Sequence, residues 1–276
     1  MSEVQLDVEA LARHAAELRG QVVTLSHQAK TAHLGSSLSC ADIVAAAYWH
    51  VLNIDPAKPD DPDRDRFILS KGHAAMTLYS ILAVRGFFPK ALLDTYNKDG
   101  GKLAEHPPAN GLPGVEAATG SLGHGLPIGA GMALSGKMKG QSYRVYCLLS
   151  DGECNEGSVW EAAMFAAAQK LNNLCVIVDY NKWQATGRSN ETLALAPLRD
   201  KWEAFGWDAY EIDGHDIGDV AQRMVNVPNG SSKPVALIAN TVKGKGVSFM
   251  EDDNNWHYRA PTAEELDQAF VELGLK

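Results

Sequence analysis

YRVYCLLSDGECNEGSVWEAAMFAAAQKLNNLCVIVDYN, residues 143–181, is the stretch that decides the fold. It opens with an apolar run at 143–149 and closes with another at 174–178, each as long as a typical buried strand. Between them, Ser158 and Glu161 stand at the spacing of a capping box, which predicts a helix that runs to about residue 170. A strand, a helix and a strand in this order form a βαβ unit with parallel strands and a right-handed crossover.

The flanking sequence extends this unit into a larger sheet. Short apolar runs predict three further strands, at residues 67–69, 209–212 and 235–239. Helices are predicted from residue 8 to about 28, from a second capping box at Ser39 and Asp42 to about 52, and from Gly72 onward. No internal repeat or linker divides the chain. Residues 1–276 are therefore predicted to form one doubly wound α/β domain, with a mostly parallel sheet and helices on both faces.

The composition excludes several classes of protein. A net charge of −9 and a pI near 5.5 disfavour nucleic acid and anionic membranes as partners. No apolar run approaches the ~18 residues of a membrane span, and the N-terminal segment lacks the apolar centre of a signal peptide. The four cysteines form no C-x-x-C pair, so we expect buried, reduced thiols in a cytoplasmic protein.

Polar residues follow both strands of the βαβ unit. Ser150, Asp151 and Gly152 end the first strand, and Asn181 follows the second. Open parallel sheets bind ligands just beyond the carboxyl ends of their strands. A carboxylate and an amide oxygen at that edge suit magnesium or calcium with room for phosphate oxygens, and Gly152 lets the backbone approach a diphosphate closely. The alternative is that Asp151 and Asn181 only cap strand ends and turns.

The spacing of these residues resembles the thiamine-diphosphate motif, an aspartate within Gly-Asp-Gly followed by an asparagine about thirty residues later. Here Asp151 precedes Asn181 by 30 residues, and Ser150 replaces the first glycine. The resemblance implies that the chain binds thiamine diphosphate together with the metal.

Six stretches, in the family's order and over almost the whole chain, together resemble the N-terminal domain of transketolases. They are AHLGSSLSCADI (32–43), RDRFILSKGHAAMTLYSIL (64–82), HPPANGLPGVEAATGSLGHGL (106–126), SDGECNEG (150–157), VDYNKWQATG (178–187) and the pair Trp256 and His257. Leu34 stands where many long transketolases have proline, a form that is similar to the shorter, two-subunit transketolase-like proteins.

This resemblance implies a role for particular residues. Asp151, Asn181 and the main-chain oxygen of Trp183 would hold the metal. The diphosphate and the rest of the cofactor would contact His73, Gly120, Ser121, Leu122, Gly152, Asn181 and His257. The donor sugar would lie against His33, His106 and His257, because imidazoles exchange hydrogen bonds and protons with sugar hydroxyls. Glu156 and Glu161 match glutamates near the dimer interface that are proposed to relay protons between active sites.

The resemblance also implies a partner. In this family, the glutamate that activates the cofactor and the arginines that bind a sugar's distal phosphate belong to a second domain. We therefore expect the N-terminal subunit of a heteromeric transketolase, an α2β2 assembly with a C-terminal subunit that carries the pyrimidine-binding and C-terminal domains. The pair would move a two-carbon ketol unit from a ketose to an aldose, as sugars or sugar phosphates, and this chain alone would be inert.

Other interpretations remain open at this point. The chain could be a 1-deoxyxylulose-phosphate synthase-like protein or the α subunit of a 2-oxo-acid dehydrogenase, although the histidine set and LPGVEAATGSLGHGL count against both. A nicotinamide dehydrogenase is disfavoured, because Gly129 and Gly131 lack a third glycine at the required spacing. A cofactor-binding module without catalytic activity is a further alternative. We assign no site role to His14, His27, His50, His124 and His215.

Overall fold

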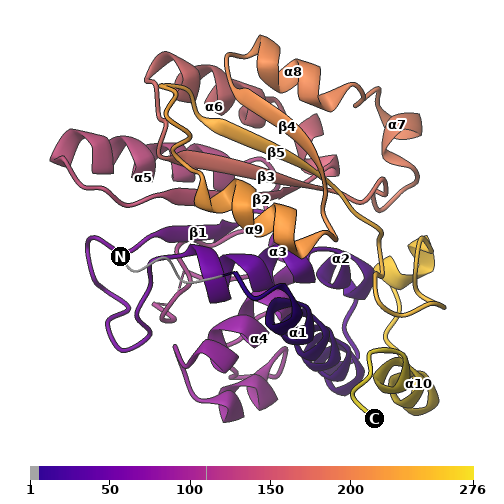
Figure 1. Ribbon diagram of the computed structural model, residues 1–276. Coiled ribbons are helices and arrows are strands. Elements are labelled where there is room, and N and C mark those ends of the chain that lie inside the picture. Colours follow the sequence, from indigo (N-terminus) through magenta and orange to yellow (C-terminus); the bar gives the residue numbers. More distant parts are fainter. Residues whose placement is uncertain (1–5, 110) are drawn as a thin grey trace.

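A computed structural model describes residues 6–109 and 111–276, and its centre is a five-stranded parallel sheet (Figure 1). The strand order is β1-β2-β3-β5-β4, and every neighbouring pair is parallel. The strands are β1 (Arg66–Leu69), β2 (Val145–Ser150), β3 (Leu174–Tyr180), β4 (Asp208–Asp213) and β5 (Val235–Asn240). All five coincide with the predicted runs to within two residues at each end, and the α/β fold is confirmed.

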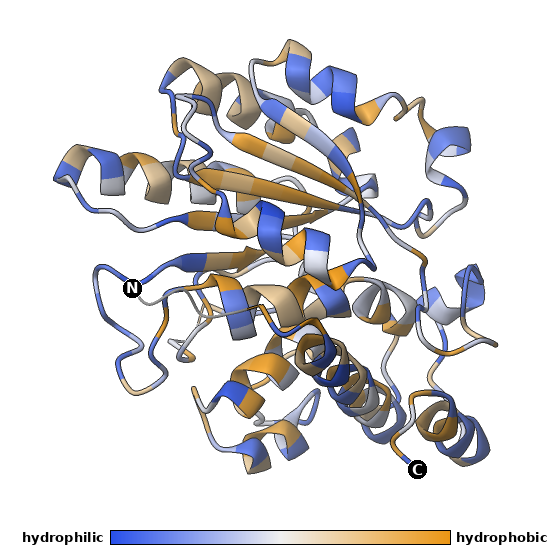
Figure 2. Cartoon of the chain, in the orientation of Figure 1, coloured by the Kyte–Doolittle hydropathy of each residue, from blue (hydrophilic) through white to orange (hydrophobic). Residues whose placement is uncertain are grey.

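Helices cover both faces of this sheet. Strand side chains alternate between two cores: Tyr146 and Leu148 of β2 belong to one, and Cys147 and Leu149 to the other. The first core is covered by α1 (Val8–Ala29), α3 (Ala41–Ala46), α4 (Ala75–Arg85) and α9 (Ile217–Val225). The second is covered by α5 (Gly125–Lys139), α6 (Gly157–Ala168) and α8 (Leu198–Ala204). Figure 2 shows the result: apolar strands inside and hydrophilic helix surfaces outside.

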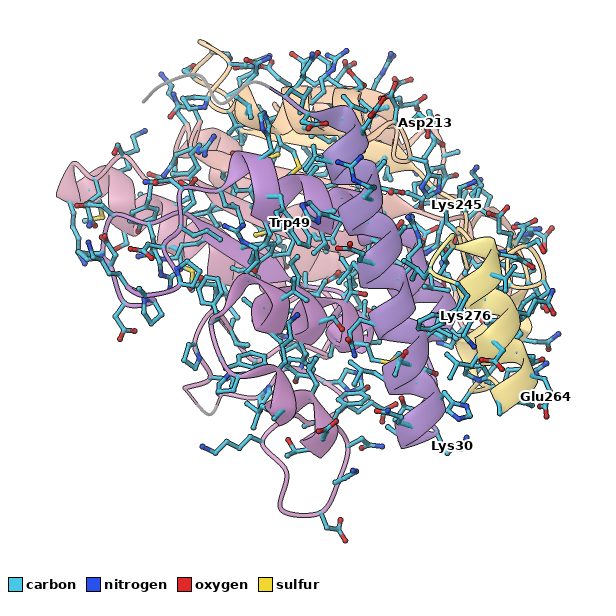
Figure 3. The ribbon with its side chains drawn as sticks, turned by 60° about the horizontal axis from the view of Figure 1, so that its bottom comes forward. Lys30, Trp49, Asp213, Lys245, Glu264 and Lys276 are labelled. Atoms are coloured by element: carbon cyan, nitrogen blue, oxygen red, sulfur yellow. The ribbon has the colours of Figure 1, made fainter. Side chains whose placement is uncertain are left out.

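Shorter elements complete the chain. They are α2 (Leu34–Ser39), the π-helical turn η1 (Ala47–Val51), η2 (Gly72–Ala74), η3 (Lys90–Thr95), η4 (Gly152–Asn155), α7 (Ser189–Thr192), η5 (Asn254–His257) and α10 (Ala263–Glu272). The C-terminal α10 packs beside α1 (Figure 3). No helix in the described ranges has the length and apolar character that crossing a membrane requires.

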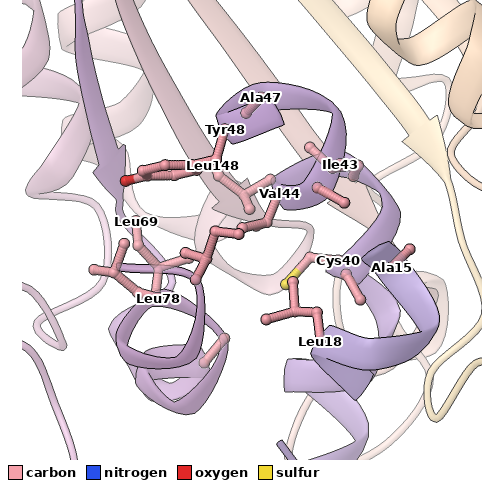
Figure 4. Close-up of a cluster of buried hydrophobic side chains, with 14 of the residues drawn as sticks. Ala15, Leu18, Cys40, Ile43, Val44, Ala47, Tyr48, Leu69, Leu78 and Leu148 are labelled. Carbon is pink, nitrogen blue, oxygen red and sulfur yellow. The ribbon is translucent and has the colours of Figure 1, made fainter. Parts of the chain in front are cut away.

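The first core packs α3 firmly between the sheet and α1 (Figure 4). Ile43 and Val44 of α3 are fully buried, and Leu148 of β2 and Leu18 of α1 belong to the same cluster. Cys40 is buried among them, and all four cysteines are buried free thiols, as predicted. The packing fixes α2 and α3, which precede and follow Cys40, against the carboxyl end of the sheet.

The two predicted capping boxes are wrong. The Ser39 hydroxyl donates to Asp179 at 2.6 Å, and Asp42 instead accepts two hydrogen bonds from Arg19, at 3.0 and 2.6 Å. The Ser158 hydroxyl donates to the carbonyl oxygen of Gly123 at 2.9 Å, and α6 begins at Gly157 without a side-chain cap. Partners distant in sequence have displaced the local cap in both cases, so Ser39 ties the end of α2 to β3, and Ser158 ties α6 to the loop before α5.

Candidate cofactor and active site

A cavity of about 400 Å³ lies at the carboxyl ends of β2 and β3. This is the edge at which open parallel sheets bind ligands. Most of the predicted site residues line it: His33, His73, His106, Gly120, Leu122, Gly152, Glu156, Asn181, Trp183 and His257. The long irregular segment between η3 and α5 and the η5 turn thus meet the strand ends at one place.

Asp151 is buried between two residues of the cavity wall, Ser150 and Gly152. Its carboxylate accepts hydrogen bonds from the Gly152 N–H, the Lys182 N–H and the Ser189 hydroxyl, each at 2.8 Å. None of these donors is a cationic group, and burial raises the pKa of Asp151 to about 6. A buried carboxylate without a cationic partner is costly, so a bound cation would stabilise it.

The oxygens around Asp151 fit a hard divalent cation. A carboxylate offers about four lone-pair positions, and the three hydrogen bonds leave one for a metal. The side-chain oxygen of Asn181 accepts one hydrogen bond, from the Trp183 N–H at 3.0 Å, and keeps its second lone pair. Within the described ranges no cluster of three His, Cys, Asp or Glu side chains could hold a metal. Main-chain, phosphate and water oxygens would therefore have to complete the shell, as magnesium commonly requires.

A buried ion pair supports the floor of this site. Lys71 donates to Asp179 and to the carbonyl oxygen of Ser36, and both charged side chains are fully buried. Asp179 also accepts from Ser39 and Thr241. Burial opposes the ionisation of Asp179, but the Lys71 ammonium and these hydrogen bonds hold its pKa below the ordinary value. The pair ties α2, β1, β3 and the end of β5 together, and it was not predicted from the sequence.

Asp179→Asn is expected to lower the free energy of unfolding by about 3–5 kcal/mol, because the Lys71 ammonium would be left buried and unpaired. Urea denaturation measures the change. The control is Asp200→Asn, which removes an exposed aspartate 2.8 Å from Arg199 and should cost no more than about 1 kcal/mol. Equal effects of the two substitutions would contradict a structural role for the buried pair.

Four histidine rings gather at the cavity, with His33 at their centre. Its ring centroid lies 4.9 Å from that of His257, 5.5 Å from His73 and 5.8 Å from His106. His33 adopts a left-handed backbone conformation, φ 68°, just before α2, and its N–H donates to the carbonyl oxygen of His257 at 2.9 Å. Burial lowers the pKa of His73 well below the ordinary value and that of His257 to about 3. These two rings therefore stay neutral near pH 7.

Lys243 is a site residue that sequence reasoning missed. Its ammonium is buried, lies 3.0 Å from Nδ1 of His257 and donates to Asn254 at 2.7 Å. Burial lowers the pKa of Lys243 to about 8, so the group is mostly charged at pH 7. An ammonium can only donate, so Nδ1 of His257 accepts and its Nε2 carries the hydrogen.

Close backbone approaches and unpaired polar atoms mark the cavity wall as a binding surface. A Cβ at Gly120, φ 135°, would lie 2.8 Å from the His106 ring, and one at Gly152 would lie 3.1 Å from the Gln184 side chain. The side-chain oxygen of Asn155 and the side-chain nitrogen of Gln184 are buried there without a hydrogen-bond partner among the described residues. They offer a ligand one acceptor and one donor. Both lie in stretches that resemble the transketolase family, at 150–157 and 178–187, but the sequence alone predicted no role for either residue.

The family model described as "Transketolase, thiamine diphosphate binding domain" matches residues 12–276. The chain belongs to the transketolase family. It is 42% identical to an apulose-4-phosphate transketolase subunit of Actinobacillus succinogenes, over 99% of both chains. It is 40% identical to 6-deoxy-6-sulfo-D-fructose transketolase subunit SqwG of a Clostridium species, over 99% of this chain and 98% of that one.

Solved transketolases share the fold. The enzyme of Campylobacter jejuni superposes with a TM-score of 0.92 at 28% identity, and the match covers 98% of this chain and 44% of the other. The Pichia stipitis enzyme in complex with sedoheptulose 7-phosphate gives 0.90 at 26% identity, over 97% of this chain and 41% of the other. This chain thus spans less than half of those chains, whereas it matches the two transketolase subunits over nearly their whole length. The predicted resemblance to the two-subunit transketolases is confirmed.

Three of the residues assigned from the transketolase resemblance lie away from the cavity centre. Glu156 is exposed at the cavity rim, and Ser121 is exposed beside Leu122. Glu161 is exposed on α6 and lines a separate hollow with His124 and Phe165. The two glutamates therefore do not meet in one pocket of this chain, and their relay role stays a prediction.

The histidines without an assigned site role have other contacts. His14 stacks on Trp49 with ring centroids 4.2 Å apart, and Nδ1 of His27 lies 2.9 Å from the carbonyl oxygen of Pro261. His215 is half-buried between Asp42 and the Val242 N–H, which donates to its Nε2 at 2.9 Å. None of these three rings lines the transketolase cavity.

Proposed function

We propose that this chain is the N-terminal subunit of a heteromeric transketolase, which transfers a two-carbon ketol unit from a ketose to an aldose. The observation that carries the proposal is the cavity at the strand ends, where the Asp151–Asn181 pair and four histidine rings lie together. The near full-length similarity to single subunits of other transketolases supports it. A cofactor-binding module without catalytic activity would have no use for the histidine cluster.

The cofactor would be held at the floor of the cavity. Asp151, Asn181 and the main-chain oxygen of Trp183 would bind magnesium or calcium, and the metal would bridge to the diphosphate. The diphosphate would lie against Gly152, Asn181 and His73, and the rest of the cofactor along the loop of Gly120, Ser121 and Leu122, with His257 nearby. Bound thiamine diphosphate supplies the electron sink that makes cleavage of the sugar's carbon–carbon bond accessible.

The histidines would handle the donor sugar. His33, His106 and His257 reach the cavity from three separate segments, so they can contact several hydroxyls at once. Neutral imidazoles exchange protons and hydrogen bonds with hydroxyl oxygens near pH 7. The protein's part in the reaction is therefore to position these oxygens and to move their protons.

The partner would be a C-terminal transketolase subunit that carries the pyrimidine-binding and C-terminal domains, in an α2β2 assembly in the cytoplasm. Met164 and Phe165 on α6 leave 53% and 42% of their surface exposed, close to Glu161. Exposed apolar surface of this kind is typical of a face that a partner covers. Glu156 and Glu161 would then lie at the interface, where a proton relay between active sites is proposed.

Relatives are named for apulose 4-phosphate and for 6-deoxy-6-sulfo-D-fructose, sugars that carry a phosphate and a sulfonate. We propose a sugar or sugar phosphate here, with its distal group recognised by the partner.

Replacement of His33, His106 or His257 by Ala is expected to lower turnover by about ten- to a thousandfold, because each removes a hydrogen bond made in the transition state. Melting temperatures should stay within a few degrees of the parent. Steady-state kinetics with the assembled enzyme and a ketose–aldose pair measure the effect, and His14→Ala, which removes an imidazole on α1 outside the cavity, is the control. Full activity in all three variants would place the donor sugar elsewhere.

A further inference from the structure

Two charged side chains of opposite sign lie against the histidine cluster. On one side, the Lys243 ammonium contacts Nδ1 of His257 at 3.0 Å. On the other, Oε1 of Glu105 lies 3.3 Å from Nδ1 of His33. The two imidazole rings are nearly perpendicular, 88°, with centroids 4.9 Å apart. Each ring of this central pair therefore has one nitrogen engaged by a charge.

Glu105 and His33 lie within ion-pair distance, but their atoms are not aligned for a hydrogen bond. Nδ1 of His33 is buried, and no described group meets full hydrogen-bond geometry toward it. The Glu105 side chain is 37% exposed, so a small rotation can align it with the ring. A carboxylate only accepts, so the favourable partner is an Nδ1–H, and the hydrogen bond of one ring nitrogen decides which nitrogen carries the proton.

We infer that Glu105 is a positioning residue of the reaction, which holds His33 as the tautomer that is protonated at Nδ1 and accepts a proton at Nε2. The neighbouring His257 has the other tautomer: Lys243 holds its Nδ1 as an acceptor, so its Nε2–H is a donor. The inference rests on the proposed function, because it assigns directions of proton transfer within the proposed sugar site. It adds a residue that the resemblance to transketolases did not suggest.

In these two tautomers, Nε2 of His33 accepts a proton and Nε2–H of His257 donates a hydrogen bond, so the direction of proton transfer at each ring is fixed. A hydroxyl of the donor sugar loses its proton to Nε2 of His33: the O–H bond breaks, the Nε2–H bond of an imidazolium forms, and the electron pair remains on the sugar oxygen. The Nε2–H of His257 donates a hydrogen bond to a neighbouring oxygen. The Glu105 carboxylate stabilises the imidazolium as it forms, which is the role of the third group in nucleophile–base–carboxylate triads.

The charges around His33 set the sign of the expected pH effect. Burial lowers the pKa of His33, the Glu105 carboxylate opposes that shift, and His106 and Lys243 lower the pKa further. The titratable groups that face the ring are Glu105, His73, His106, Lys243 and His257. Loss of the carboxylate therefore lowers the pKa of His33. Because a proton acceptor must be neutral, the acid limb of kcat/KM moves to lower pH.

The test uses the assembled enzyme, with its partner chain and thiamine diphosphate, in Glu105→Ala, Glu105→Gln and Glu105→Asp forms. Ala and Gln are expected to lower kcat at least about tenfold and to move the acid limb to lower pH. Asp keeps the charge and should restore part of kcat. In a His33→Ala background, Glu105→Ala should cause no further loss. Asp99→Asn, which removes an exposed carboxylate six residues earlier, should change neither quantity.

A second readout does not depend on turnover. Nitrogen-15 NMR of labelled histidine in the assembled protein should show His33 protonated at Nδ1 in the parent and a mixture of tautomers in Glu105→Gln. The Gln variant is used because it keeps the shape of the Glu105 side chain, whereas Ala could disturb the loop. Unchanged kcat and acid limb in Glu105→Gln, or a loss in Glu105→Ala that adds in full to that of His33→Ala, would overturn the inference. An Nδ1–H signal that depends on Glu105, in an assembly that transfers no ketol unit, would uphold the tautomer assignment and reject the proposed function.

Discussion

Asp151→Ala is expected to abolish thiamine diphosphate binding to the assembled enzyme, even in excess magnesium. The substitution removes the charged ligand of the proposed metal site and leaves the Asn181 amide oxygen and a main-chain oxygen. Loss of an outer-shell partner of a metal site already weakens binding by about ten- to a hundredfold, so loss of this ligand should cost at least about a hundredfold in affinity. Titration calorimetry with thiamine diphosphate and magnesium measures the change.

Two further variants separate binding from folding. Asp151→Asn keeps the shape of the side chain and one oxygen, which can still accept from the Lys182 N–H and the Ser189 hydroxyl, the two donors that share Oδ2 in the parent. Only the hydrogen bond from the Gly152 N–H to Oδ1 is lost, so the variant should fold and still bind the cofactor weakly. Asp213→Ala removes another aspartate at the carboxyl end of a strand, outside the cavity, and should leave the affinity unchanged. If Asp151→Ala bound the cofactor as tightly as Asp213→Ala does, the metal assignment would be wrong.

The sheet was the part of the fold that the sequence predicted best. β3 was expected at residues 174–178 and runs over Leu174–Tyr180, because a strand buried on both faces is apolar at every position. The right-handed βαβ rule then placed Asp151 and Asn181 at one edge of the sheet, and the structure brings their neighbours to one cavity.

The contacts that the sequence did not predict join residues far apart in the chain. Lys71 and Asp179 meet only because β1 and β3 flank β2, and nothing near either residue indicates the pairing. The capping-box predictions failed for the same reason, since Ser39 and Ser158 have stronger partners elsewhere. α2 was also missed: the sequence at 31–39 is rich in small polar residues, and packing against the core makes it helical.

We propose that this chain holds only part of an active site. The chain would supply the metal ligands Asp151 and Asn181, the cofactor loop of Gly120, Ser121 and Leu122, and the histidines that contact the donor sugar. A transketolase partner would supply the groups that activate the cofactor and bind the sugar's distal end. Because obligate interfaces are large and apolar, the isolated chain is expected to self-associate and to bind the cofactor weakly. Activity should then depend on the concentrations of both chains.

The most direct test assays this chain by itself and then mixed with its C-terminal partner, each time with thiamine diphosphate, magnesium and a ketose–aldose pair. We expect no ketol transfer by the single chain and full transfer by the mixture, with activity that saturates at equal amounts of the two chains. Turnover by the single chain at a rate comparable to that of the mixture would contradict this proposal.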